Sequence, residues 1–148
     1  MTFEERGNMS GKTLMLLPGT CCDWQMNFQN VIDDLAAKYH LILVNYDGFD
    51  GSDLIFPDMI NVTGKIEKYI IDNHNGRIDG ALGSSLGSSF VGQLIQRENI
   101  HMDPRFYPET KKVLGHYLFG YNRKTHLTHI IVSFPIAALI AWICTLFT

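Results

Sequence analysis

Apolar and polar positions alternate through the first hundred residues in a pattern that predicts three strands, each followed by a helix. Short apolar runs bounded by turn residues predict buried strands, and apolar residues at helical spacing predict helices with one buried face. The predicted strands are residues 13–17, 40–46 and 78–82, and the predicted helices are residues 24–38, 62–71 and 86–97. This alternation favours an α/β fold, a partial doubly wound parallel sheet covered by helices.

Three predicted loops fall at the carboxyl edge of this sheet, where open α/β sheets bind their ligands. They are residues 18–23, 47–53 and 83–87. The last reads Gly83-Ser84-Ser85-Leu86-Gly87, a GxSxG pattern between a predicted strand and a predicted helix. In such a turn the glycines relieve crowding while a strained backbone holds the serine hydroxyl out towards a reacting carbonyl. Ser85 is therefore the candidate nucleophile.

Three segments, in order along residues 13–103, resemble the α/β-hydrolase superfamily. Leu16-Leu17-Pro18-Gly19-Thr20 is similar to the strand and oxyanion loop of that family, with Pro18 in place of the usual histidine. Asn45-Tyr46-Asp47-Gly48-Phe49-Asp50-Gly51-Ser52 is similar to the loop that often reads Asp-x-x-Gly-x-Gly-x-Ser. The Gly83 to Gly87 pattern matches the nucleophile elbow at every position.

The resemblance implies a serine hydrolase that acts on an ester, thioester or amide of a small acyl-containing substrate. Ser85 would attack the acyl carbonyl, and the backbone N–H groups of Leu86 and Thr20 would form the oxyanion hole. Chemistry of this kind implies no cofactor. We also expect no metal site, because Cys21, Cys22 and Cys144 lack metal-ligand spacing.

The family also supplies an acid and a histidine from loops after later strands, but the resemblance ends near Asp103. The candidates for the base are His116, His126 and His129, and those for the acid are Asp50 and Asp53. Three further histidines, His40, His74 and His101, are expected at the opposite end of the sheet. The incomplete triad leaves two readings open: a hydrolase whose short chain lacks activity or completes its triad differently, and a non-catalytic, membrane-tethered binding module on the same core.

The C-terminal third divides into two segments beyond the core of residues 1–103. Residues 104–129 are predicted to form a lid or a connecting helix. Residues 130–147 hold no charge over 18 positions, and a helix of that length spans about 27 Å, close to the hydrocarbon core of a bilayer. We expect a transmembrane tail, a buried core segment or a non-native end of a truncated product, and the sequence does not choose among them.

Length and charge narrow the remaining classes. The chain has 148 residues and a formal net charge of −3, and its basic residues form no stripe interleaved with aromatics, which argues against nucleic-acid binding. The polar N-terminus precedes an apolar run too short for a signal peptide, so we expect a protein at the cytoplasmic face that is not secreted. An anion cradle at residues 83–89 is disfavoured, because the P-loop lysine and a GxGxxG pattern are absent. Nothing in the sequence indicates the oligomeric state.

Overall fold

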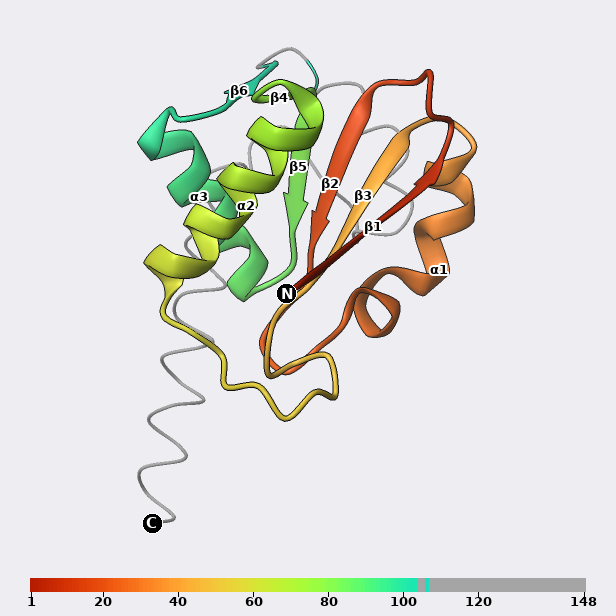
Figure 1. Cartoon of the computed structure of the whole chain (residues 1–148). Helices are drawn as coiled ribbons and strands as arrows, with labels where there is room; N and C mark the ends of the chain where they lie inside the picture. The colour runs from red at the N-terminus through yellow and green to blue at the C-terminus, as the bar shows by residue number, and fades with distance from the viewer. Residues whose placement is uncertain (104–105, 107–148) are drawn as a thin grey trace, which may run out of the picture. The chain divides into compact units, whose positions relative to one another are not determined.

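The computed structural model describes residues 1–103 and Phe106, and within them three helices cover a central sheet (Figure 1). The strands are β1 (Thr2–Gly7), β2 (Thr13–Leu17), β3 (His40–Asn45), β4 (Arg77–Ile78), β5 (Gly80–Gly83) and β6 (His101–Met102). The helices are α1 (Trp24–Ala36), α2 (Met59–His74) and α3 (Leu86–Arg97). The α/β class predicted from the sequence is therefore confirmed.

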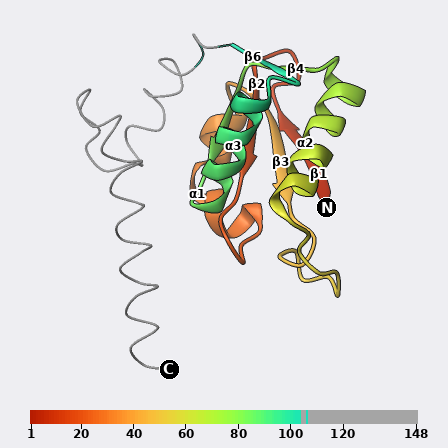
Figure 2. The same ribbon diagram turned by 90° about the vertical axis from the view of Figure 1, so that its left-hand side faces the viewer.

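The main sheet has the order β1-β3-β2-β5, in which β2 is parallel to both β3 and β5. The short strands β4 and β6 pair with each other, also in parallel. Figures 1 and 2 show β4 and β6 at one end of the sheet and the loops that follow β2, β3 and β5 at the other. The three loops of interest therefore share the carboxyl edge, as the sequence predicted.

Two apolar clusters fill the spaces between the sheet and its helices. Side chains of β2 point alternately to the two faces, so Leu14 and Leu16 join the α1 cluster while Met15 and Leu17 join the cluster beneath α2 and α3. Burial on both faces explains why this strand reads as a continuous apolar run rather than an alternating one. The covering helices lie on opposite sides of the sheet in Figure 1.

The strand β1 was not predicted, and it corrects the expectation of an all-parallel sheet. It pairs antiparallel with β3, with Thr2 opposite Asn45 and Gly7 opposite His40. Its sequence is too polar to stand out, because polar and aromatic contacts rather than aliphatic burial fix its place. Phe3, for example, stacks on Tyr69 of α2 with the ring centroids 3.8 Å apart.

Capping explains the bounds of α2, which begins three residues before the predicted helix. The Asp58 side chain accepts the Asn61 N–H at 2.9 Å, and Asn75 ends the helix in a left-handed conformation with a φ of 53°. Both are ordinary cap residues.

The predicted segments 104–129 and 130–147 lie outside the described residues except for Phe106. That ring is buried against the α1 cluster and meets Tyr39 edge to face at 5.4 Å. Within the part of the chain that the structure describes, no helix is long and apolar enough to cross a membrane.

Candidate active site

The turn between β5 and α3 holds Ser85 in a backbone conformation that residues with side chains rarely adopt. Its φ and ψ are 49° and −112°, and its side chain makes no capping hydrogen bond to α3. Such a conformation costs about 1–3 kcal/mol and persists only where the surrounding structure imposes it. The side chain is exposed at the carboxyl edge of the sheet. This is the geometry of a nucleophile elbow.

Gly83 and Gly87 are needed because β5 packs directly against the start of α3, and the start of α3 packs directly against the end of β2. A Cβ atom on Gly83 would lie 2.2 Å from the carbonyl carbon of Gly87, and a Cβ atom on Gly87 would lie 2.0 Å from the carbonyl oxygen of Leu17. Neither position can accept a side chain unless the backbone moves. Close packing therefore explains the spacing of the GxSxG pattern.

Backbone hydrogen bonds fix the residues on either side of Ser85. The Ser84 N–H donates to the Leu17 carbonyl at 2.9 Å, and the Gly87 N–H donates to the Ser84 carbonyl at 2.8 Å. The Ser85 hydroxyl itself has no hydrogen-bond partner among residues 1–103 and Phe106. A fixed backbone thus carries an unengaged hydroxyl.

Residues 18–23, which we call the oxyanion loop, approach this serine through Gly19. Gly19 is buried, and a Cβ atom on it would lie 3.4 Å from the Cβ atom of Ser85. The Gly19 N–H donates to Oδ1 of Asn27 in α1 at 2.6 Å. The loop is therefore held beside the elbow by a side chain from a helix.

The two backbone groups expected to form the oxyanion hole are available for a ligand. The N–H groups of Thr20 and Leu86 have no acceptor among the described residues, and the same holds for that of Cys21. The N–H groups of Gly19 and Gly87, by contrast, are already hydrogen bonded. Thr20 and Leu86 therefore keep unengaged N–H donors, one in the oxyanion loop and one directly after Ser85.

The candidate acids lie in the loop that follows β3, at the same edge of the sheet. Hydrogen bonds from the Ser52 side chain and backbone, at 2.6 and 3.1 Å, hold the pKa of Asp50 below its usual range. Asp53 is exposed. Asp47 is buried, and its Oδ2 accepts from the Lys65 ammonium at 2.6 Å. Asp50 thus stabilises its own turn, and a role as the triad acid stays a prediction.

None of the described histidines reaches Ser85. His40 and His74 direct their Nε2 atoms to the two carboxylate oxygens of Glu5, at 2.7 and 2.9 Å, and His101 lies in β6 at the far end of the sheet. Their expected place away from the elbow is confirmed. The candidate bases, His116, His126 and His129, lie outside the described residues.

The two cysteines beside the elbow and the possible metal ligands were also located in the described residues. Cys21 and Cys22 are free thiols. No group of three or more histidine, cysteine, aspartate or glutamate side chains among residues 1–103 is placed to hold a metal ion.

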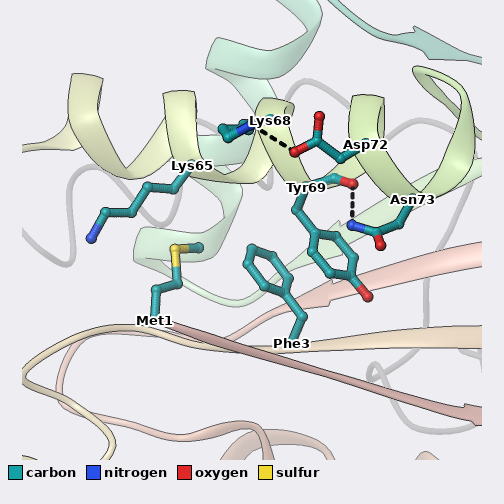
Figure 3. Close-up of a pocket in the computed structure, with 7 residues that line it drawn as sticks. All are labelled: Met1, Phe3, Lys65, Lys68, Tyr69, Asp72 and Asn73. Atoms are coloured by element: carbon teal, nitrogen blue, oxygen red, sulfur yellow. Dashed lines mark hydrogen bonds and ion pairs between the residues drawn. The ribbon is translucent and has the colours of Figure 1, made fainter.

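Two surface grooves lie along α2, away from the elbow. One groove of about 310 Å³ is bounded by β1 and α2 and lined by Met1, Phe3, Lys65, Lys68, Tyr69, Asp72 and Asn73 (Figure 3). A second, of about 510 Å³, is lined by Pro57, Ile60, Asn61, Gly64, Lys65, Lys68 and Arg97. In the first, the ammonium of Lys68 already pairs with Asp72 at 2.7 Å. Neither groove includes Ser85 or any residue of the oxyanion loop.

Two asparagines that shape the site were not recognised from the sequence as site residues. Asn27 accepts the Gly19 N–H, and Asn45 at the end of β3 accepts the Trp24 N–H at 2.9 Å. Asn45 stood in a segment that matched a family loop, whereas Asn27 lies in an ordinary helical pattern. No sequence signal marked Asn27, because its role depends on how α1 packs beside β2.

No family model matches the sequence, and no curated protein matches it. Among solved structures, an α/β hydrolase family protein from Desulfitobacterium hafniense is similar to the chain with a TM-score of 0.64 and 22% identity, over 68% of this chain and 41% of that one. A hydrolase from Pseudomonas aeruginosa is similar with a TM-score of 0.58 and 13% identity, over 68% of this chain and 38% of its own. A marine microorganism esterase is similar with a TM-score of 0.54 and 12% identity, over the same shares.

Each of these likenesses covers about two thirds of the chain. The chain spans about two fifths of the length of the solved structures it matches. Shared strand and helix arrangement at low identity establishes a fold and not an activity. Over its described residues, the chain has the α/β-hydrolase fold.

Proposed function

We propose that the protein is a serine hydrolase that cleaves an ester, thioester or amide through Ser85. The observation that carries the proposal is the strained backbone of Ser85, with its φ of 49°, between N–H donors at Thr20 and Leu86 that have no acceptor among the described residues. Strain of this kind clusters at functional sites.

In the proposed reaction Ser85 Oγ forms a bond to the acyl carbon while its proton passes to a histidine. The carbonyl π electrons move to oxygen, and the N–H groups of Thr20 and Leu86 stabilise the resulting oxyanion. When the tetrahedral intermediate collapses, the bond to the leaving group breaks and the histidine returns the proton to that group. Water then attacks the acyl-enzyme while the histidine takes its proton, and the second tetrahedral intermediate collapses as the histidine returns that proton to Ser85 Oγ. The carboxylic acid product is released.

The general base is proposed among His116, His126 and His129. Serine is a weak nucleophile near neutral pH, so a base must take its proton. Small-molecule substrates agree with the hydrolases and the esterase whose fold the chain shares.

Labelling of the full chain with a fluorophosphonate tests this proposal. Ser85 Oγ would displace fluoride from phosphorus, so we expect the wild type to gain one phosphonyl group at Ser85. Ser85→Ala should not be labelled, and Ser84→Ala serves as the matched control because that serine is adjacent but only partly exposed. Loss of labelling in one of three single alanine variants at positions 116, 126 and 129 would identify the base. Folded wild-type protein that stays unlabelled contradicts the enzyme proposal.

A further inference from the structure

We propose that Asn27 is a positioning residue that sets the oxyanion loop in place for the reaction at Ser85. The inference rests on the proposed function and assigns a role that the GxSxG pattern does not contain. Asn27 touches neither the substrate carbonyl nor Ser85 in this role. It acts through Gly19, whose N–H it binds at 2.6 Å.

Asn27 is attached to a rigid part of the fold. It follows the first turn of α1, where the Asp23 side chain accepts the Met26 N–H at 2.7 Å and caps the helix. Trp24 and Phe28, on either side of Asn27 in α1, are buried in the core. An acceptor held this firmly can fix a neighbouring loop within a fraction of an ångström, which a site on loops alone does not achieve.

Gly19 transmits this position to the elbow because it lies between Asn27 and Ser85. A Cβ atom on Gly19 would lie 3.4 Å from Asn27 Oδ1 and 3.4 Å from the Ser85 Cβ atom. Gly19 is buried, so without Asn27 its N–H would lack water as well as a protein acceptor. Leaving a buried donor unpaired is unfavourable, and a loop relieves that cost by moving.

The hydrogen bond to Asn27 also decides which N–H groups remain for the oxyanion. Gly19 is engaged, whereas Thr20, the next residue, is exposed and has no acceptor among the described residues. Two further hydrogen bonds hold the two ends of the oxyanion loop. The Tyr46 hydroxyl donates to the Pro18 carbonyl at 3.2 Å, and the Asn45 side chain accepts from the Trp24 N–H, directly after the loop, at 2.9 Å. Thr20 is thus a free donor in a loop fixed on both sides.

Asn27→Leu, Asn27→Asp and Asn30→Leu together test this role. Leucine has the same number and branching of side-chain heavy atoms as asparagine but accepts no hydrogen bond, whereas aspartate keeps an acceptor oxygen at the same place. Asn30 is an exposed asparagine in the same helix and controls for the change in helix composition. The first measurement is hydrogen exchange of the Gly19 amide by NMR, which needs no catalytic activity.

We expect the Gly19 amide to exchange at least tenfold faster in Asn27→Leu than in the wild type, and to regain protection in Asn27→Asp. The second measurement is the rate of fluorophosphonate labelling at Ser85, well below the unfolding midpoint of every variant. A displaced donor lowers that rate by about tenfold or more in Asn27→Leu. Asn27→Asp should recover the larger part of the loss, and Asn30→Leu should match the wild type.

The outcomes separate this inference from the proposed function. A wild type that is labelled together with an equally fast Asn27→Leu overturns the positioning role while the proposed function stands. A wild type that is not labelled overturns the proposed function and, with it, the catalytic part of the inference. If the Gly19 amide exchanges equally fast in Asn27→Leu and in the wild type, the hydrogen bond from Gly19 to Asn27 does not hold the loop, whatever the labelling result. A purely structural role would lower the unfolding midpoint of Asn27→Leu without changing either rate in folded protein.

Discussion

Gly87→Ala and Gly92→Ala place the same methyl group on the same helix with opposite expected effects. Both glycines lie in α3, but a Cβ atom on Gly87 would lie 2.0 Å from the Leu17 carbonyl oxygen, whereas a Cβ atom on Gly92 meets nothing within 4 Å. Ordinary contact begins at 3.4 Å, so the helix start must move by about 1.4 Å to admit the Gly87 variant. The atoms that a Cβ atom on Gly87 would meet all belong to the backbone of Leu17 and Pro18, so no side-chain rotation relieves the clash.

The magnitudes follow from packing and from helix propensity. Overpacking of a close contact costs about 1–3 kcal/mol, so Gly87→Ala should lower the free energy of unfolding by about 2 kcal/mol. Alanine in an exposed helix interior is favoured over glycine by about 1 kcal/mol, so Gly92→Ala should raise it by that amount. Because Leu86 directly precedes Gly87, the same movement displaces a donor of the proposed oxyanion hole.

Urea unfolding followed by circular dichroism measures both changes, and fluorophosphonate labelling of the folded variants measures the effect on the elbow. We expect the two midpoints to shift in opposite directions with unchanged denaturant dependence. Labelling should slow in Gly87→Ala alone. If Gly87→Ala were as stable as Gly92→Ala and were labelled at the wild-type rate, the reasoning that close packing requires glycine at the elbow would be refuted.

Three further predictions concern the scaffold. Burial raises the pKa of Glu5, but hydrogen bonds from Tyr69, His40 and His74 outweigh this and hold the pKa below its usual value of 4.5. The wild type should therefore be more stable than Glu5→Gln, and this difference should be fully present above pH 4.5. It should disappear as the pH falls through the lower pKa that Glu5 has in the folded protein. Urea unfolding at a series of pH values measures the difference. Glu67 is buried and accepts from Arg97 at 2.8 and 2.9 Å, so Arg97→Met should cost about 2 kcal/mol in the same assay, and no loss would contradict the pairing. Phe106→Ala should cost about 3 kcal/mol by thermal or urea unfolding because its ring is buried in the α1 cluster, and a neutral effect would contradict that packing.

The sequence predicted those elements whose signals are local. The apolar run of β2 ends at Pro18-Gly19, and α3 combines a clear helical period with the GxSxG turn before it, so both have the predicted bounds. The nucleophile candidate was found for the same reason, because an elbow needs its glycines at fixed offsets from the serine. Periodicity and turn chemistry are properties of neighbouring residues.

Elements that depend on distant partners were missed or misjudged. The strand β1 carries only one large apolar side chain, Phe3, among polar residues, and its contacts with α2 and β3 come from far along the chain. Asn27 gives no sequence signal, because its partner Gly19 is brought near by the packing of α1. The donors at Thr20 and Leu86 were expected from the family resemblance, and their freedom from other hydrogen bonds could be known only from the folded backbone.

The strand β1 also protects the molecule against unwanted association. It covers the outer edge of β3, whose residues from His40 to Val44 are all buried and form an aggregation-prone aliphatic sequence. The strand that takes the edge position instead carries Glu4, Glu5 and Arg6, and charges on an edge strand discourage pairing with another chain. Removal of residues 1–7 would leave the edge of β3 without its hydrogen-bonding partner, so the strand of the main sheet with the fewest apolar side chains shields one of the most apolar strands.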